Sequence, residues 1–173
     1  MVYTQKDVPA GSPLRVSYGD PTNPSPLFAK YGFFDNSVTT TFCKLMTVQQ
    51  EMDDLGIDYS KMLFYETGEI ADEVWDVLLY QILAADTNLQ QGFYQAYTTG
   101  DAETKAGYHQ QYYANTLEAL KNHVVGTLMD IDQLTETAYT KDPSTHPRLP
   151  VILNHNEFVK NTFLKVKARL DGM

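Results

Sequence analysis

Residues 102–139 read AETKAGYHQQYYANTLEALKNHVVGTLMDIDQLTETAY, and this stretch decides the fold class of the chain. Its apolar side chains recur every three or four positions, the spacing that places them on one face of an α-helix. They are Tyr113, Leu117, Leu120, Val124, Leu128, Ile131, Leu134 and Ala138. We therefore predict one helix over residues 102–139, which at about 1.5 Å per residue would be about 55 Å long. A helix of that length with one apolar face needs other elements packed along it.

Three further helices are expected on either side of this stretch. Residues 71–84 have apolar side chains at helical spacing and begin with Asp72 and Glu73, whose carboxylates complement a helix N-terminus. Residues 49–55 are typical of a short helix that Gly56 ends. The sequence DPSTHP at 142–147 interrupts the helical pattern. A last helix over about residues 151–170 should bury Phe158, Phe163, Val166 and Leu170, while Lys160, Lys165, Lys167 and Arg169 form a solvated basic face.

The first 35 residues have a different pattern, rich in Pro and Gly. Residues 2–4 and 14–18 are strand-like, and PAGSP at 9–13 suits a tight reversal between them, so we predict a β-hairpin. A short helix over about residues 24–31, ended by Gly32, and a strand within residues 39–45 should follow. The predicted fold is therefore α+β and mostly α, with residues 1–35 as a strand-rich segment and residues 36–173 as a helical lobe.

Composition and charge exclude several classes of protein. The chain has 173 residues, 43% of them hydrophobic, which is enough for one compact domain with a core. Its net charge of −9 is the wrong sign for a nucleic acid or an anionic membrane surface. It has one cysteine, Cys43, and no apolar run long enough to span a bilayer. No targeting segment is recognisable near Met1, so we predict an intracellular protein, without assigning it to the chloroplast, cytosol or nucleus.

The motif that indicates a function lies near the N-terminus. The sequence reads AGSPLRVSYGD at residues 10–20, followed by Asn23 and then KYGF at residues 30–33. Two Tyr-Gly pairs thirteen positions apart, with a turn and an Asn-initiated helix between them, resemble the end of the SET domain in protein-lysine methyltransferases of the Rubisco large-subunit methyltransferase-like class. In that family a helical lobe associated with substrate binding follows, and residues 36–173 are similar to it in length and helicity.

The resemblance implies roles for three aromatic residues. Tyr18 corresponds to the catalytic tyrosine, and Tyr31 and Phe33 to the walls of the pocket where the substrate lysine meets the methyl donor. The family binds S-adenosylmethionine largely through upstream residues that include an Asn-His-Ser motif. We therefore expect the chain to be the last part of a longer enzyme, or to pair with a separate chain that carries the missing half, and to bind no cofactor by itself.

Lysine methylation explains why such residues would be needed. The ε-amine must be neutral to attack a sulfonium methyl, although its reference pKa is about 10.4, so the site has to desolvate it. Aromatic rings provide an apolar channel whose faces tolerate a cation, and a tyrosine hydroxyl can orient the amine. The simpler interpretation is that Tyr18, Tyr31 and Phe33 are buried aromatic residues of a small core.

Other candidate sites in the sequence are weak. Asp130, Asp132 and Glu136 lack the spacing and the glycine of a calcium loop, and the four histidines are too scattered for zinc, so we expect no metal. Cys43 lies in an apolar strand, where packing is a better explanation than catalysis. The pair Asn154-His155 comes 136 residues after Tyr18, too late for the family motif, and we assign it a capping or hydrogen-bonding role.

A second function from a different class stays open. The chain could be a non-catalytic subunit or adaptor that retains a relic of the SET hairpin and binds a partner protein through its long helix. Fold resemblance alone does not establish activity.

Overall fold

The computed structural model describes residues 7–13, 28, 30, 32, 34 and 38–173. This part of the chain is mostly helical with a short two-stranded antiparallel sheet, which confirms the predicted fold class. The turn expected at residues 9–13 is present, since the amide of Ser12 donates to the carbonyl of Pro9 and Gly11 has φ +84°. The predicted hairpin strands at 2–4 and 14–18 lie outside the described residues.

Six α-helices and one 3₁₀ turn account for most of the described chain. They are α2 (Gln49–Leu55), the 3₁₀ turn Tyr59–Lys61, α3 (Asp72–Leu83), α4 (Thr87–Thr99), α5 (Ala102–Gln111), α6 (Tyr113–Tyr139) and α7 (Leu149–Asp171). The helices predicted at 49–55, 71–84 and 151–170 are thereby confirmed. Helix α4 was not predicted, because its only buried residues are Phe93 and Ala96 and most of its other residues are polar or aromatic.

The sheet joins the N-terminal half of the described chain to α7. Strand β1 (Thr40–Phe42) pairs antiparallel with β2 (Leu63–Tyr65), so the predicted strand at 39–45 is present but shorter. The ring of Phe64 packs against Phe163 of α7 with 5.0 Å between centroids. In the turn after β2, Gly68 has φ +89°, and a Cβ there would lie 2.9 Å from the carbonyl oxygen of Lys165. Only glycine allows the turn to approach α7 this closely.

Helix α3 is the centre of the core. It contacts α2, α4 and α6, and its buried residues point in every direction around its axis. A helix that is apolar on all sides is buried among other elements, which is the position that α3 occupies. The one charged residue among those buried side chains is Asp76.

The predicted single helix over residues 102–139 is wrong, because the chain bends at Tyr112. This residue has φ −106° and ψ 15°, outside the α-helical region, and separates α5 from α6. Helix α6 alone is about 40 Å long at about 1.5 Å per residue. Two residues assigned to its inward face, Tyr113 and Leu134, are 42% and 61% exposed. Tyr113 is the first residue after the bend, and Leu134 lies beyond Ile131, the last buried residue of α6.

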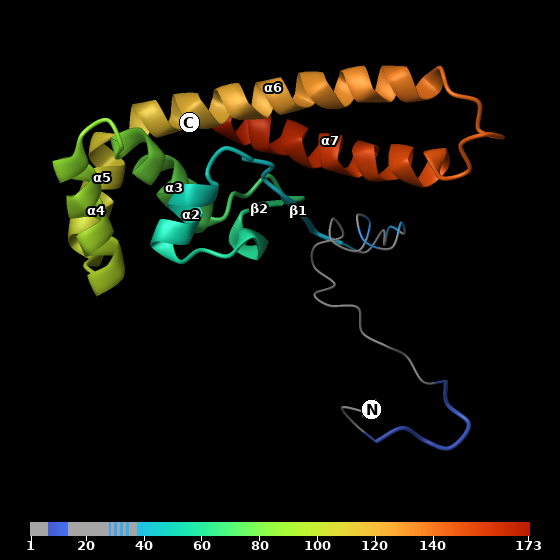
Figure 1. Cartoon of the computed structure of the whole chain (residues 1–173), viewed down its shortest axis with the longest axis horizontal. Helices are drawn as coiled ribbons and strands as arrows, with labels where there is room; N and C mark the ends of the chain where they lie inside the picture. Colours follow the sequence, from blue (N-terminus) through green and yellow to red (C-terminus); the bar gives the residue numbers. More distant parts are fainter. Residues whose placement is uncertain (1–6, 14–27, 29, 31, 33, 35–37) are drawn as a thin grey trace.

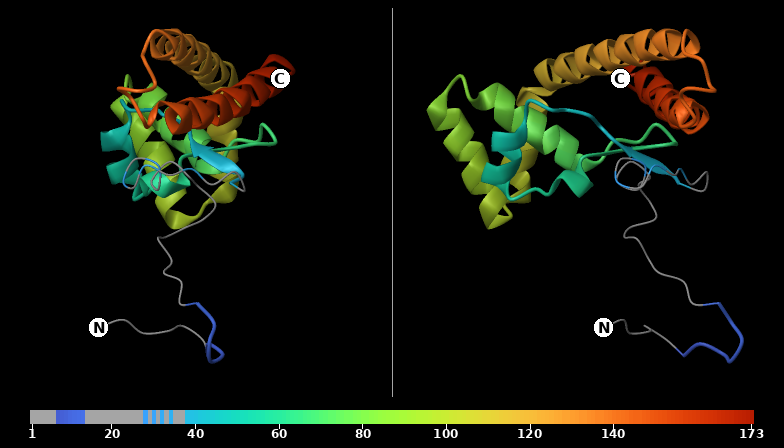
Figure 2. Two further views of the ribbon diagram at one scale, coloured as in Figure 1. Left: turned by 90° about the vertical axis from the view of Figure 1, so that its right-hand side faces the viewer. Right: turned by 45° about the vertical axis from the view of Figure 1, so that its right-hand side comes forward.

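Helices α6 and α7 form a long antiparallel hairpin (Figure 1). In Figure 1 the closed end of the hairpin extends beyond helices α2 to α5, and Figure 2 turns this end toward the viewer. As predicted, Phe163, Val166 and Leu170 are buried, and Phe158 is half-buried. We refer to residues 38–112 as the body and to residues 113–173 as the hairpin.

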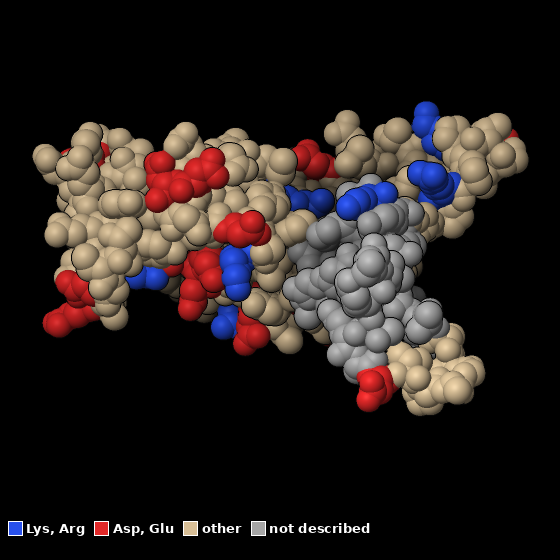
Figure 3. All heavy atoms as spheres, turned by 60° about the horizontal axis from the view of Figure 1, so that its bottom comes forward, with Lys and Arg blue, Asp and Glu red and all other residues tan. Residues whose placement is uncertain are grey.

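The negative charge of the protein lies in the body. Residues 38–112 contain twelve Asp and Glu and three Lys, whereas residues 113–173 contain seven acidic and seven basic residues. On the face drawn in Figure 3, acidic side chains gather over the body, and basic side chains are more prominent toward the hairpin. The excess of carboxylates is therefore concentrated around α2 to α5.

Candidate functional site

The three residues predicted from the motif, Tyr18, Tyr31 and Phe33, lie outside the described residues. The described residues around two of them agree with the expected local structure. Phe28 and Lys30 are helical, and Gly32 has φ +72° with its amide donating to the carbonyl of Phe28. Phe28 and Lys30 are thus helical as predicted, and Gly32 is not, while the rest of the helix predicted at 24–31 lies outside the described residues.

Phe28 and Phe34 both contact the inner face of α7. The ring of Phe28 stacks on His155 with 4.1 Å between centroids and a 7° interplanar angle, and Phe34 meets the same imidazole edge-on at 5.7 Å. Phe34 also lies 5.4 Å from the ring of Phe158. These contacts fix the described ends of the segment that contains Tyr31 and Phe33 against α7.

The capping or hydrogen-bonding role assigned to His155 is wrong. It lies in the second turn of α7, is only 6% exposed, and neither of its ring nitrogens has a hydrogen-bond partner in the described part of the chain. Burial, with the nearby charge of Lys44, lowers the pKa of His155 to about 4. The imidazole is therefore neutral at pH 7 and acts as an aromatic surface for Phe28 and Phe34.

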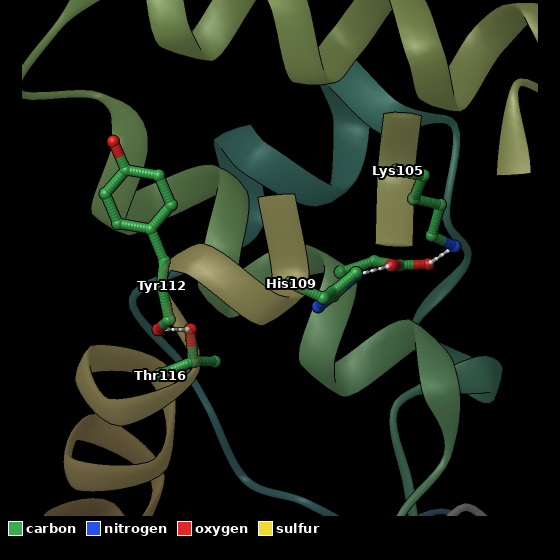
Figure 4. Close-up of polar contacts among 5 residues, drawn as sticks. Lys105, His109, Tyr112 and Thr116 are labelled. Atoms are coloured by element: carbon green, nitrogen blue, oxygen red, sulfur yellow. Dashed lines mark hydrogen bonds and ion pairs between the residues drawn. The ribbon is translucent and has the colours of Figure 1, made fainter. Parts of the chain in front are cut away.

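A buried charge cluster links α3 to α5. The side chain of Asp76 is 5% exposed, and each of its two carboxylate oxygens contacts a side chain from one face of α5. Lys105 donates from Nζ to Oδ2 at 2.6 Å, and Nε2 of His109 lies 2.8 Å from Oδ1. Figure 4 shows both side chains converging on this carboxylate. Each carboxylate oxygen thus has a partner, which a buried charge requires.

Sequence reasoning missed this cluster, although two signals for it existed. Asp76 interrupts the buried pattern of α3 formed by Val74, Val77 and Leu78. Lys105 and His109 are four residues apart, so they share one face of α5. What could not be seen is that α5 packs with this face toward α3, since Asp76 and His109 are 33 positions apart in the sequence.

The cluster forms part of the floor of a groove along α3. One hollow, of about 550 Å³, is lined by Asp72, Trp75, Asp76, Ala102, Lys105, Ala106, His109, Tyr113 and Met173. A second hollow, of about 460 Å³, shares Asp72, Trp75 and Met173 with the first and is otherwise lined by Tyr65, Glu69, Ile70, Ala71, Glu73 and Arg169. We call the two adjoining hollows the α3 groove.

The side chains of the α3 groove offer groups for recognition and for proton exchange. Asp76 orients the ring of His109 through Nε2, an arrangement that general-base sites also use. The described side chains that line the groove include no Ser, Thr or Cys that could act as a nucleophile. Nor do the described residues contain a group of three or more His, Cys, Asp and Glu placed to hold a metal ion. The cluster is best explained as a clamp between two helices beneath a binding surface.

Cys43 is not a reactive site. Its side chain is fully buried, and burial raises the pKa of the thiol to about 12, so the nucleophilic thiolate does not form at neutral pH. Its carbonyl oxygen lies 2.6 Å from Nε2 of His123 on α6. Cys43 thus packs in the core as predicted, and its backbone ties the end of β1 to the hairpin.

No family model, curated protein or solved structure matches the chain. Within the described residues, no helix is both long and apolar enough to cross a bilayer.

Proposed function

We propose that this chain is the C-terminal portion of an intracellular, S-adenosylmethionine-dependent protein-lysine N-methyltransferase. In this proposal Tyr18 is the catalytic tyrosine, Tyr31 and Phe33 wall the lysine channel, and the helical lobe binds the protein substrate. The observation that carries it is the pair of Tyr-Gly dipeptides at 18–19 and 31–32 with Asn23 between them.

The described structure supports the proposal at two points. The motif is followed by a helical lobe, as in the family that it resembles. Phe28 and Phe34, which flank Tyr31 and Phe33 in sequence, contact α7 through His155. A segment attached to the lobe in this way can present a target lysine to the site while the lobe holds the substrate protein.

The methyl donor is assigned to residues outside this chain. This assignment follows the resemblance, in which the donor is bound largely by residues that precede the motif. In the proposal the chain contributes the lysine side of the reaction: its aromatic rings desolvate the ε-amine, which favours the neutral form, and the Tyr18 hydroxyl orients the nitrogen.

A second candidate is a non-catalytic adaptor, and the exposed end of the hairpin favours it. Met129, Leu134 and Tyr139 of α6 are 68%, 61% and 73% exposed. A partner that wraps around this end of the hairpin would cover all three side chains. The adaptor would use the hairpin to bind a partner and would need no methyl donor.

The reading frame upstream of Met1 separates the two candidates. The methyltransferase proposal expects an in-frame Asn-His-Ser motif there, or a separate partner chain that carries it. Expression of this extended or paired protein should transfer a radiolabelled methyl group from S-adenosylmethionine to protein lysines. An extended or paired protein that binds the donor but methylates no lysine in an extract of the source cells would favour the adaptor.

A further inference from the structure

The α3 groove is open to solvent and has walls from four elements. Its floor is the N-terminal half of α3, with α5 and the start of α6 on one side and the end of β2 and the C-terminal turn of α7 on the other. Because the two hollows share Asp72 and Trp75, a ligand that fills both would pass over the first turn of α3. The groove is therefore long enough for several residues of an extended peptide.

The charge of the groove is negative. Glu69, Asp72 and Glu73 line it, and of these Glu69 and Asp72 are exposed. The positive charge of Lys105 is matched by Asp76 at 2.6 Å, which leaves Arg169 as the remaining Lys or Arg among the described lining residues. The surrounding body carries twelve acidic residues against three lysines, so its long-range field also attracts cations.

Aromatic rings lie between these carboxylates. Trp75 is half-buried in the groove and stacks with Tyr113 at 6.5 Å between centroids, and Tyr65 lines the second hollow. Aromatic faces bind the ammonium of lysine and the guanidinium of arginine, most strongly when the ring is tryptophan. The apolar stems of the same side chains can lie along Ala102 and Ala106.

We propose that the α3 groove binds an extended, lysine- and arginine-bearing segment of a partner protein. One cationic side chain lies over Trp75 and Tyr113, and a neighbouring one meets Asp72 and Glu73. The inference does not depend on methyl transfer: such a segment could belong to a substrate of the enzyme or to a partner of the adaptor. Its test uses binding by the 173-residue chain and no activity, so its failure is distinct from failure of the proposed function.

Trp75 provides the measurement, because it is the only tryptophan in the chain. The probe is a ten-residue peptide of alternating Lys and Ala with blocked ends and no aromatic residue. Titration into the full chain should change Trp75 emission saturably, with a dissociation constant of about 10–100 μM for a few ion pairs and one cation–π contact. A Glu-Ala peptide of equal length should leave the emission unchanged.

Two matched double variants separate the groove from the overall charge. Asp72→Asn with Glu73→Gln should weaken binding at least about fivefold. Asp130→Asn with Glu136→Gln removes the same charge from exposed positions on α6 and should change the affinity less than about twofold. Circular dichroism and thermal melts of each variant show whether it is folded.

Several outcomes would overturn the proposal. They are unchanged Trp75 emission with the Lys-Ala peptide, equal weakening by the two double variants, and binding of spermine as tight as binding of the peptide. The last result would identify a site for small polycations. A folded Asp72→Asn, Glu73→Gln protein that binds the peptide normally would also contradict it.

Discussion

Asp76 of α3 and Lys105 of α5 form an ion pair with 2.6 Å between Oδ2 and Nζ, and the aspartate side chain is only 5% exposed. This contact, together with His109, holds α5 against the central helix. It also neutralises a charge that would otherwise lie unpaired beneath the α3 groove. Removal of Lys105 should therefore lower the free energy of unfolding much more than removal of a lysine from an exposed ion pair.

Lys105→Met keeps the aliphatic stem and removes the charge. It should lower the free energy of unfolding by about 2 kcal/mol, because the buried carboxylate of Asp76 retains only His109 as a partner. Lys167→Met is the matched control, since Lys167 pairs with Asp171 at 2.6 Å but both side chains are about half exposed. Lys167→Met should lower the free energy of unfolding by less than about 0.5 kcal/mol. Equal losses in urea denaturation would show that the α3–α5 pair is no more important than a surface pair.

The fold should lose stability between pH 6.5 and pH 4 because of His155. Its folded pKa of about 4 lies below the ordinary histidine pKa of about 6.5, so the unfolded chain binds the proton more readily. The stabilisation is complete above about pH 6.5 and falls as the pH drops through this window, by about 3 kcal/mol. Burial also lowers the pKa of His123, which acts in the same direction.

His155→Phe should retain the aromatic contacts with Phe28 and Phe34 and remove this pH dependence. Denaturant unfolding at pH 7 and pH 4.5 measures the difference. His146→Gln is the control, because His146 is exposed in the loop before α7. If His155→Phe loses as much stability on acidification as the unmodified protein does, His155 is not the group responsible.

Gly68→Ala should be strongly destabilising, by about 3 kcal/mol. The new Cβ would lie 2.9 Å from the carbonyl oxygen of Lys165, and φ at this position is +89°. Gly126→Ala provides the contrast, since Gly126 is inside α6 and a Cβ there meets no atom within 4 Å. That substitution should stabilise the protein by about 0.5–1 kcal/mol. A tolerated Gly68→Ala in thermal unfolding would contradict the close approach of this turn to α7.

The sequence predicted elements whose signals are local and missed those set by distant contacts. Helix α2 ends at Gly56 in the left-handed conformation, and α3 and α7 have clear apolar spacing with a charged or glycine boundary. The bend at Tyr112 has no such signal, because no Pro or Gly lies within four residues of it. There the packing of α5 on α4, together with the contacts of Lys105 and His109 with Asp76, outweighs the local preference for one continuous helix.

The candidate site also has one part that the sequence predicts and one part that only the folded structure reveals. The Tyr18, Tyr31 and Phe33 motif is contiguous in sequence and could be recognised without a structure. The α3 groove could not, because Trp75, Tyr113 and Arg169 come from three separate helices. Only the packing of these helices brings an aromatic pair and a set of carboxylates to one surface.

The 173-residue chain should not bind S-adenosylmethionine. The proposal assigns donor binding to residues outside this chain, as the resemblance implies. Isothermal titration calorimetry at millimolar ligand should give no binding heat. Micromolar affinity would place the donor site within this chain and would require a new assignment of Tyr18.

The turnover of Tyr18→Phe in the extended or paired enzyme tests the central claim most directly. The account predicts that loss of the hydroxyl lowers methyl transfer about 100-fold and changes the affinity for S-adenosylmethionine less than about twofold, because Tyr18 acts on the reacting geometry. Tyr94→Phe, an equivalent change at a 41% exposed position of α4 with no assigned role, should retain full activity. Unchanged turnover in folded Tyr18→Phe would contradict the claim and leave Tyr18 as a structural residue.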